Sequence, residues 1–348
     1  MSQTDPSPVI DLINAFRRSQ TMFTAVSLGI FDLLASESES AEALVSKAQS
    51  AEALASATGT DLRALRRLLD GCVGLGLLDK RDGLYANTTV AHEYLRKASP
   101  NTLAGYILYS RDALYPMWGH LDDAMREGTP RWKQTFGLDG GIFSGFFRTP
   151  QAKHEFLLGM HGFGRISSPA VVRVFNLGRF RRLVDLGGAT GHLAIAACER
   201  YGSLHGVVFD LPEAIAEARP HVAASSAAAR IELVTGDFFA DALPPADLYA
   251  LGRIVHDWGD EKIEILLGKI HAALPPGGAI LLAETLLDDD HAGPVPSLMQ
   301  SLNMLVCTEG RERSAGEYRE LLERCGFTQV EGRRTGAPLD AVLAFRKE

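Results

Sequence analysis

Val184-Asp-Leu-Gly-Gly-Ala-Thr-Gly-His192 is the stretch of sequence that decides the fold. Its first residues complete a β-rich run that begins at Arg182, and a helical pattern follows its last residue. Glycines allow the backbone to turn sharply and to approach a ligand closely. This order of strand, glycine-rich loop and helix is typical of an open α/β sheet, where ligands bind at the carboxyl ends of the strands.

The sequence that follows alternates between short β-rich runs and amphipathic helices. Helical patterns lie between the first five runs, which predicts an α/β fold with a doubly wound, mostly parallel, Rossmann-like sheet over residues 180–348. The predicted strands are Arg182–Leu186, His205–Phe209, Ile231–Thr235, Leu248–Arg253, Ala279–Glu284, Val330–Arg333 and Ala341–Phe345.

Residues 1–100 are predicted to form a separate α-helical winged-helix domain. Asp61 follows the turn Thr58-Gly-Thr60 and has the character of an N-cap, so we expect a helix–turn–helix around it. A small hairpin is predicted directly afterwards. The predicted pieces are the helix Ala51–Ala57, the helix from Leu62, and the strands Leu77–Lys80 and Leu84–Ala86.

Two functions fit a winged helix: DNA binding and dimerisation. Arg63, Arg66 and Arg67 would be the contacts of a DNA-binding face. The chain has a net charge of −8, however, which disfavours a nucleic-acid partner and favours a solvated helix face on a dimerisation scaffold. We therefore expect a homodimer formed through this domain.

The composition also indicates where in the cell the protein is located. No run approaches the roughly 18 apolar residues that a membrane span needs, and the first residues have neither a basic start nor an apolar stretch. The four cysteines show no metal-ligand spacing. We expect a cytoplasmic protein with no membrane partner.

The segment 101–179 is predicted to be mostly helical and is rich in aromatic residues. These residues fit either a hydrophobic core or the wall of a flat apolar pocket. We expect this segment to be a helical linker that contributes to a substrate pocket, with Phe147 and Met160 among the residues that contact the substrate.

Acidic residues stand at the ends of the first three predicted strands. Asp185 opens the glycine-rich loop, which lacks the G-x-G-x-x-G pattern of a pyrophosphate site and suits a cationic ammonium group better. Asp210 suits the hydroxyls of a ribose, and Asp237, beside Phe238, suits an adenine amino group. A single aspartate after a strand is more often a residue that forms a turn. Three aspartates after three successive strands, however, predict an adenosyl ligand with a cationic amino-acid end.

Six stretches carry a family resemblance: Asp185-Leu-Gly-Gly-x-x-Gly191, Val208-Phe-Asp-Leu-Pro212, Gly236-Asp-Phe-Phe239, Arg253-x-x-His-Asp-Trp258, Ser301-Leu-Asn-Met-Leu-Val306 and Thr308-Glu-Gly-x-Glu-Arg313. With these stretches the chain resembles the class I methyltransferases of the plant caffeate and animal hydroxyindole O-methyltransferase type. The resemblance covers nearly the whole chain. Ala189 departs from the family pattern, which has a glycine there.

The resemblance implies an S-adenosyl-L-methionine-dependent O-methyltransferase whose acceptor is a small aromatic molecule with a hydroxyl group. S-adenosyl-L-homocysteine would be the product of the cofactor. The implied cofactor-binding residues are Asp185, Gly187, Gly188, Asp210, Leu211, Gly236, Asp237, Phe238 and Arg253. No carboxylate cluster indicates bound magnesium, so we expect a reaction without a metal.

His256 is the candidate general base. A phenol has a pKa of about 10, so a histidine within hydrogen-bond reach is needed to remove its proton at neutral pH. The resemblance implies that Glu284 and Glu312 flank this histidine and orient its ring. Asp257 fits two interpretations: a contact to a second polar group of the substrate, or the N-cap of the next helix.

A helix is predicted over Pro296–Thr308, where Met299, Asn303 and Cys307 share one face at a spacing of four. The resemblance implies that this face lines the acceptor pocket, whereas Met and Cys at this spacing also fit a core.

Three other functions are compatible with parts of the sequence. The first keeps the cofactor but performs decarboxylation or hydroxylation, which His256, Glu284 and Glu312 disfavour. The second is a ligand-sensing winged-helix DNA-binding protein. A nicotinamide-dependent reductase is disfavoured by the chemistry of the glycine-rich loop.

Overall fold

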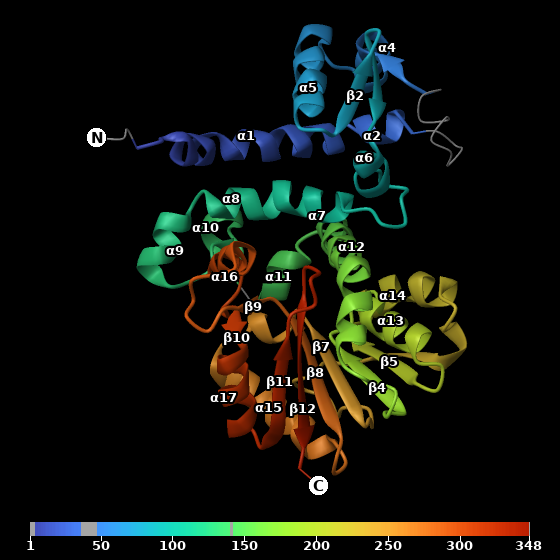
Figure 1. Ribbon diagram of the computed structural model, residues 1–348, viewed down its shortest axis with the longest axis vertical. Helices are drawn as coiled ribbons and strands as arrows, with labels where there is room; N and C mark the ends of the chain where they lie inside the picture. The colour runs from blue at the N-terminus through green and yellow to red at the C-terminus, as the bar shows by residue number, and fades with distance from the viewer. Residues whose placement is uncertain (1–3, 36–46, 140–141, 348) are drawn as a thin grey trace. The chain divides into compact units, whose positions relative to one another are not determined.

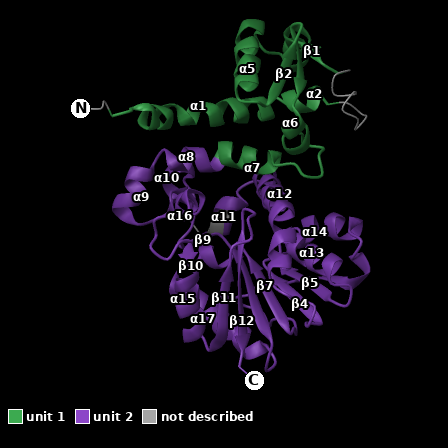
Figure 2. Cartoon of the chain, viewed as in Figure 1, with its two compact units in different colours: residues 1–112 green, residues 113–348 purple. Residues whose placement is uncertain are grey.

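The computed structural model of the protein describes residues 4–35, 47–139 and 142–347 (Figure 1). The chain divides into two compact units, residues 1–112 and residues 113–348 (Figure 2). Most of the segment 101–179 is therefore contained in the second unit. Our functional division at residues 100 and 179 stays a prediction, because it concerns roles as well as contacts. In the part of the chain that the structure describes, no helix is both long and apolar enough to cross a membrane.

The first unit contains the predicted helix–turn–helix and hairpin. The side chain of Asp61 accepts a hydrogen bond from the backbone N–H of Ala64, which confirms it as an N-cap. Gly59 ends the preceding helix with a φ of 64°, a value that favours glycine. The elements are α1 (Ser7–Ser27), α2 (Ile30–Leu33), β1 (Gln49–Ser50), α4 (Ala51–Thr58), α5 (Leu62–Gly74), β2 (Leu78–Arg81), β3 (Leu84–Asn87), α6 (Thr89–Tyr94) and α7 (Ala104–Tyr109).

Helix α1 has an apolar face that the first unit does not cover. Its N-terminal half exposes five large apolar side chains, each by 50% or more. They are Val9, Ile10, Leu12, Ile13 and Phe16. An apolar patch of this kind on a described surface is typical of a protein–protein contact.

The second unit begins with short helices and one long helix, followed by the sheet. The helices are α8 (Tyr115–Trp118), α9 (Leu121–Glu127), α10 (Trp132–Phe136), α11 (Ile142–Phe146) and α12 (Pro150–Val174), and a π-helical turn over Ser110–Leu114 precedes them.

The sheet of the second unit has seven strands in the order β11-β12-β8-β7-β4-β5-β6. The five neighbouring strands β8, β7, β4, β5 and β6 run parallel to one another. At one edge of the sheet, β12 pairs antiparallel with β8 and with β11. The predicted α/β fold with a mostly parallel sheet is thus confirmed. The strands are β4 (Arg182–Leu186), β5 (His205–Asp210), β6 (Ile231–Thr235), β7 (Leu248–Gly252), β8 (Ala279–Glu284), β11 (Phe327–Arg333) and β12 (Asp340–Arg346).

Helices cover both faces of this sheet, as double winding requires. One core cluster joins the sheet to α15 (Asp260–Ala273) and α17 (Ala315–Arg324). The other joins it to α12, α13 (His192–Arg200) and α14 (Pro212–Ala224). Alternate residues of β4 contribute to the two clusters, because successive side chains of a strand point to opposite faces.

The order of the strands fixes where a ligand binds. From β4 the chain continues to β5 and β6 on one side, and then returns to β7 and β8 on the other side. The carboxyl ends of β4 and β7 therefore flank the switch point of the sheet, which is where open α/β sheets bind ligands. The remaining elements are a 3-10 turn over Ala228–Arg230, another over Val255–Asp257, β9 (Leu286–Leu287), α16 (Val295–Cys307) and β10 (Arg313–Ser314).

Candidate active site

A cavity lies at the switch point of the sheet, within the second unit. All nine residues that we predicted to bind the cofactor line it: Asp185, Gly187, Gly188, Asp210, Leu211, Gly236, Asp237, Phe238 and Arg253. Three of the six predicted substrate contacts, Phe147, Met160 and Asp257, line the same cavity. The structure therefore brings together residues from the ends of four strands and from α12.

The glycines of the loop after β4 are required by close packing. Gly187 has a φ of +67°, and a Cβ there would lie 2.4 Å from Cδ1 of Ile254. A Cβ on Gly188 would lie 2.9 Å from the carboxyl group of Asp185. Ala189 adopts a φ of 48°, a left-handed conformation that costs an L-residue about 1–2 kcal/mol. The loop thus keeps its backbone exposed to the cavity at some cost in strain.

Two buried carboxylates are held by backbone amides of this region. Oδ2 of Asp185 accepts a hydrogen bond from the N–H of Ala194 at 3.2 Å, and burial raises the pKa of Asp185 to about 7. The carboxylate of Asp210 accepts from the N–H of Ala189 at 2.8 Å and from that of Leu211 at 2.7 Å. Burial raises the pKa of Asp210 to about 6. Desolvated carboxylates of this kind gain most from an added cation or hydroxyl donor, which fits an ammonium group and a ribose.

The loop after β6 supplies an aromatic wall. Phe238 is buried and lies close to Gly187, and its ring centroid is 4.9 Å from that of Phe239. The ring of Phe239 in turn makes an edge contact with Trp258 at 5.0 Å. These flat surfaces fit a planar base.

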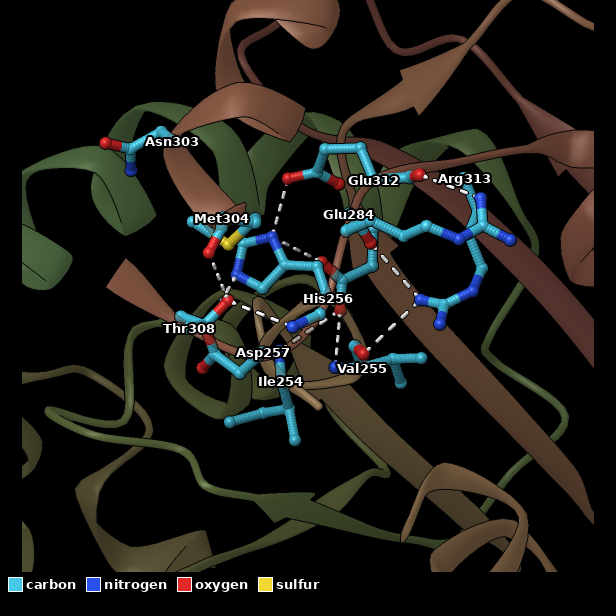
Figure 3. A network of polar contacts seen from close by, with 12 residues as sticks. Ile254, Val255, His256, Asp257, Glu284, Asn303, Met304, Thr308, Glu312 and Arg313 are labelled. Atoms are coloured by element: carbon cyan, nitrogen blue, oxygen red, sulfur yellow. Dashed lines mark hydrogen bonds and ion pairs between the residues drawn. The ribbon is translucent and has the colours of Figure 1, made fainter. Parts of the chain in front are cut away.

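His256 lies in the 3-10 turn that follows β7 and is flanked by carboxylates (Figure 3). Nδ1 of His256 is 2.6 Å from Oε1 of Glu312 and 3.4 Å from Oε2 of Glu284. Nε2 is 3.7 Å from Oδ1 of Asp257. Since Glu312 accepts the hydrogen bond of Nδ1, Nε2 is the ring nitrogen not bound to it. His256, Glu284 and Glu312 are buried and are not among the residues that line the cavity, whereas the adjacent Asp257 is.

The electrostatics of His256 are set by two opposing effects. Burial lowers the pKa of His256, but the charges of Glu312, Glu284 and Asp257 outweigh burial and raise it to about 9. Burial raises the pKa of Glu284, whose Oε1 accepts hydrogen bonds from the N–H groups of Ile254 and Val255. The cluster therefore favours a protonated imidazole, which is the product of proton abstraction.

The resemblance implied that Glu284 and Glu312 flank His256, and both carboxylates lie beside its ring. What the sequence did not indicate is that one ligand atom from each of the three residues lies within 4.8 Å of the others, which is the composition of a metal site. The Nδ1 atom is already bound to Glu312 and Glu284 is held by two amides, so the contacts support an oriented base. A reaction without a metal stays a prediction.

Asp257 does not cap the next helix. The N-cap of α15 is Gly259, and it makes no side-chain cap hydrogen bond. The carboxyl group of Asp257 lines the cavity instead, and burial raises its pKa to about 6. The N-cap interpretation of Asp257 is therefore wrong, and its contact with a substrate stays a prediction.

The three residues of α16 that we predicted to contact the acceptor do not line the cavity. Met299 is 46% exposed, whereas Asn303 and Cys307 are buried, and none of the three is among the residues that line the cavity. Oδ1 of Asn303 accepts a hydrogen bond from Nε1 of Trp118 at 2.9 Å. Burial, and to a lesser extent the charge of Asp257, raises the pKa of the Cys307 thiol. The assignment of this face to acceptor binding stays a prediction.

Several cavity residues were not singled out from the sequence. Phe143 and Phe156 belong to the aromatic segment that we considered only as a group, and Trp258 directly follows Asp257. His192 closes the glycine-rich stretch, and its Nδ1 contacts Oγ of Ser168 at 2.9 Å. The aromatic composition was the available signal for the first two. The position of His192 depends on packing against α12, which the sequence pattern does not specify.

Comparisons with known proteins agree over both units. A family profile described as an O-methyltransferase domain matches residues 118–328, and one described as an O-methyltransferase dimerisation domain matches residues 10–97. The acetylserotonin O-methyltransferase of Bos taurus is 43% identical over 336 residues, which are 95% of each chain.

Solved structures give the same result. The crystal structure of human N-acetylserotonin methyltransferase in complex with S-adenosylmethionine superposes with a TM-score of 0.91 at 36% identity, over 100% of both chains. A structure of PigF with S-adenosylhomocysteine has a TM-score of 0.86 at 27% identity, over 99% of this chain and 100% of that one.

Proposed function

Since this chain belongs to the S-adenosylmethionine-dependent O-methyltransferases, we propose that it methylates a hydroxyl group on a small, flat aromatic acceptor. A hydroxyindole is the first acceptor to test, because relatives that are 36–43% identical are acetylserotonin O-methyltransferases.

One observation carries this proposal. A single cavity is lined by the glycine-rich loop and the strand-end carboxylates, and also by Asp257 and a set of large aromatic side chains. The first set has the chemistry for an adenosyl group with an ammonium end, and the second has the chemistry for a flat acceptor with a polar substituent. The aromatic residues are Phe143, Phe147, Phe156, Phe238, Phe239 and Trp258.

The residues of the site then divide the work. Bound S-adenosylmethionine supplies an electrophilic methyl group on a positively charged sulfur. His256 accepts the proton of the acceptor hydroxyl at Nε2, while Glu312 holds the Nδ1–H and fixes the orientation of the ring. Glu284 and Glu312 stabilise the imidazolium that results. Asp257 accepts a hydrogen bond from a second polar group of the acceptor.

A panel of acceptors tests the reaction. With S-adenosylmethionine labelled in its methyl group, a hydroxyindole, a phenolic acid and a flavonoid-like phenol are each incubated with the enzyme, and labelled methyl ethers are measured. We expect transfer to at least one acceptor and none to the same ring without a hydroxyl. Binding of S-adenosylhomocysteine without transfer to any acceptor would favour decarboxylation or hydroxylation chemistry instead.

We further propose that the protein is a cytoplasmic homodimer assembled through residues 10–97. The match to a dimerisation domain and the exposed apolar side chains of α1 support this assembly. Arg66 pairs with Glu52, and this ion pair reduces the positive charge that the domain could offer to DNA. The four cysteines form no disulfide bond, which supports a location in a reducing compartment. Light scattering of the intact protein tests the dimer, and Leu12→Asp is expected to shift it towards the monomer.

A further inference from the structure

The ammonium group of Lys269, on α15, lies where backbone carbonyls of the loop after β6 converge. Its Nζ donates to the carbonyl oxygen of Phe238 at 2.9 Å, to that of Phe239 at 3.2 Å, and to that of Asp241. An ammonium group has three donors, so this loop uses all of them. The side chain is partly buried and makes these contacts from a different element of the fold.

In the loop, residues 236–241, several N–H groups are bonded within the loop, while that of Gly236 donates to the carbonyl oxygen of Asp210. The N–H of Asp237 donates to Oδ2 of Asp241 at 2.8 Å, and the N–H of Phe239 donates to Oδ1 of Asp237 at 2.8 Å. The N–H of Asp241 donates to the carbonyl oxygen of Asp237 at 2.7 Å. The carbonyls of Phe238, Phe239 and Asp241 point the other way, and Lys269 is the partner that they share.

This loop forms part of the cavity. Gly236, Asp237, Phe238 and Phe239 all line it. The start of the loop is packed closely against β5, because a Cβ on Gly236 would lie 2.3 Å from the ring of Phe209. The conformation of the loop therefore decides where the carboxylate of Asp237 and the two aromatic rings stand.

We propose that Lys269 is a positioning residue that holds the loop 236–241 in the conformation required to bind the nucleoside of the cofactor. The proposal rests on the proposed placement of the adenosyl group against Asp237 and Phe238. Without the ammonium group, three converging carbonyl dipoles lose their partner and repel one another, so the loop relaxes. The consequence is weaker cofactor binding with little change in the methyl-transfer step, because His256 and its carboxylates lie on other elements.

The variant Lys269→Met keeps most of the length of the side chain and removes its charge. Isothermal titration with S-adenosylhomocysteine is expected to show a Kd increase of about tenfold, the effect typical of losing hydrogen bonds to a charged group. We expect KM for S-adenosylmethionine to rise in parallel, while kcat at saturating cofactor stays within about twofold. Lys269→Arg should recover part of the affinity, because a planar guanidinium cannot place three donors at one point.

Lys133→Met is the matched control. Unlike Lys269, Lys133 pairs with a carboxylate, that of Asp139, and its side chain is 75% exposed and does not line the cavity. Its loss should leave the Kd unchanged. A fall in melting temperature with equal losses in kcat and in affinity would show a merely structural role for Lys269 and overturn the proposal.

The Asp210→Asn variant separates the two levels of the inference. If Asp210→Asn weakens binding and Lys269→Met does not, the role of Lys269 is refuted and the cofactor site stands. If neither variant changes the Kd, the placement of the nucleoside itself is wrong.

Should Lys269→Met fold poorly, amide hydrogen exchange in Lys269→Gln tests whether Lys269 holds the loop. The amides of Phe239 and Asp241 should exchange faster, with α15 unchanged, and unchanged exchange of both amides would contradict the proposal.

Discussion

The carboxylates at the tips of β4 and β5 and those around His256 are held in different ways, although all are withdrawn from water: Asp210 is partly buried and the other three are buried. Asp185 and Asp210 accept hydrogen bonds from backbone amides of neighbouring loops. Glu284 and Glu312 instead flank an imidazole that comes from another part of the chain. The first pair is held by backbone dipoles. The second pair, of which Glu284 also accepts from two backbone amides, contacts a group that can gain or lose a proton.

The difference shows in the causes of the pKa shifts, since both the pKa of Asp210 and the pKa of His256 are raised. Burial raises the pKa of Asp210 to about 6, so its charge is poorly compensated and an added donor is favourable. Burial alone would lower the pKa of His256, but the neighbouring carboxylates raise it to about 9. One region is therefore suited to binding, and the other is suited to accepting a proton.

The largest test of this comparison removes the base. His256→Ala is expected to lower kcat/KM by about 100- to 10,000-fold, the usual contribution of general base catalysis, while the Kd of S-adenosylhomocysteine changes by less than about twofold. Transfer of labelled methyl and calorimetric titration measure the two effects. The exposed His205, at the start of β5, provides the control variant His205→Ala. Transfer at the wild-type rate in His256→Ala would remove His256 from the mechanism.

The next test acts on the binding region. Asp210→Asn is expected to raise the Kd of S-adenosylhomocysteine by roughly 10- to 100-fold, because hydrogen bonds to a charged group are lost, and to leave kcat at saturating cofactor nearly unchanged. Glu323→Gln, near the end of α17, exposed and away from the cavity lining, is the control. An unchanged Kd in Asp210→Asn would reject the ribose assignment.

A third test uses pH. His256 must be neutral to accept a proton, and its pKa is raised to about 9, so we expect kcat/KM to rise with pH until about 9. Glu312→Gln removes the nearest charge, lowers the pKa of His256 and moves this rise to lower pH. It should also lower the plateau by about tenfold, because the imidazolium is less stabilised.

The control for this test is Glu309→Gln, since Glu309 pairs with Lys262 at the surface. The same linkage affects folding. A raised pKa for His256 means that its protonation stabilises the fold below about pH 6.5, and that this contribution is lost as the pH rises through about 9. An identical pH profile in Glu312→Gln and wild type would show that Glu312 does not govern His256.

The smallest effect is expected at α16. Asn303→Ala should destabilise the protein by about 1–3 kcal/mol, because Nε1 of Trp118 loses its acceptor, and raise the KM of the acceptor by about threefold to tenfold. Trp118→Phe removes the same hydrogen bond and keeps Asn303. If both variants lower the melting temperature and neither changes KM, Asn303 belongs to the packing of α16 alone.

Much of the fold and of the cofactor region could be predicted because the relevant contacts are local. The predicted strands Arg182–Leu186, Ile231–Thr235 and Ala279–Glu284 have the bounds that the structure gives. Asp61 caps a helix that begins with the next residue. Residues at the carboxyl ends of parallel strands meet at one edge whatever else the chain does, so Asp185, Asp210 and Asp237 could be grouped from their positions alone.

The sequence by itself thus determined the order of strands and helices, the glycine-rich turn and the set of residues around the cavity at the strand ends. Only the tertiary structure decided that Glu312 lies 2.6 Å from His256, that Asn303 is bound to Trp118, and that Lys269 meets the loop after β6. Local contacts follow from backbone geometry over a few residues. Contacts between distant elements depend on how side chains pack, and periodicity and motif spacing do not specify that packing.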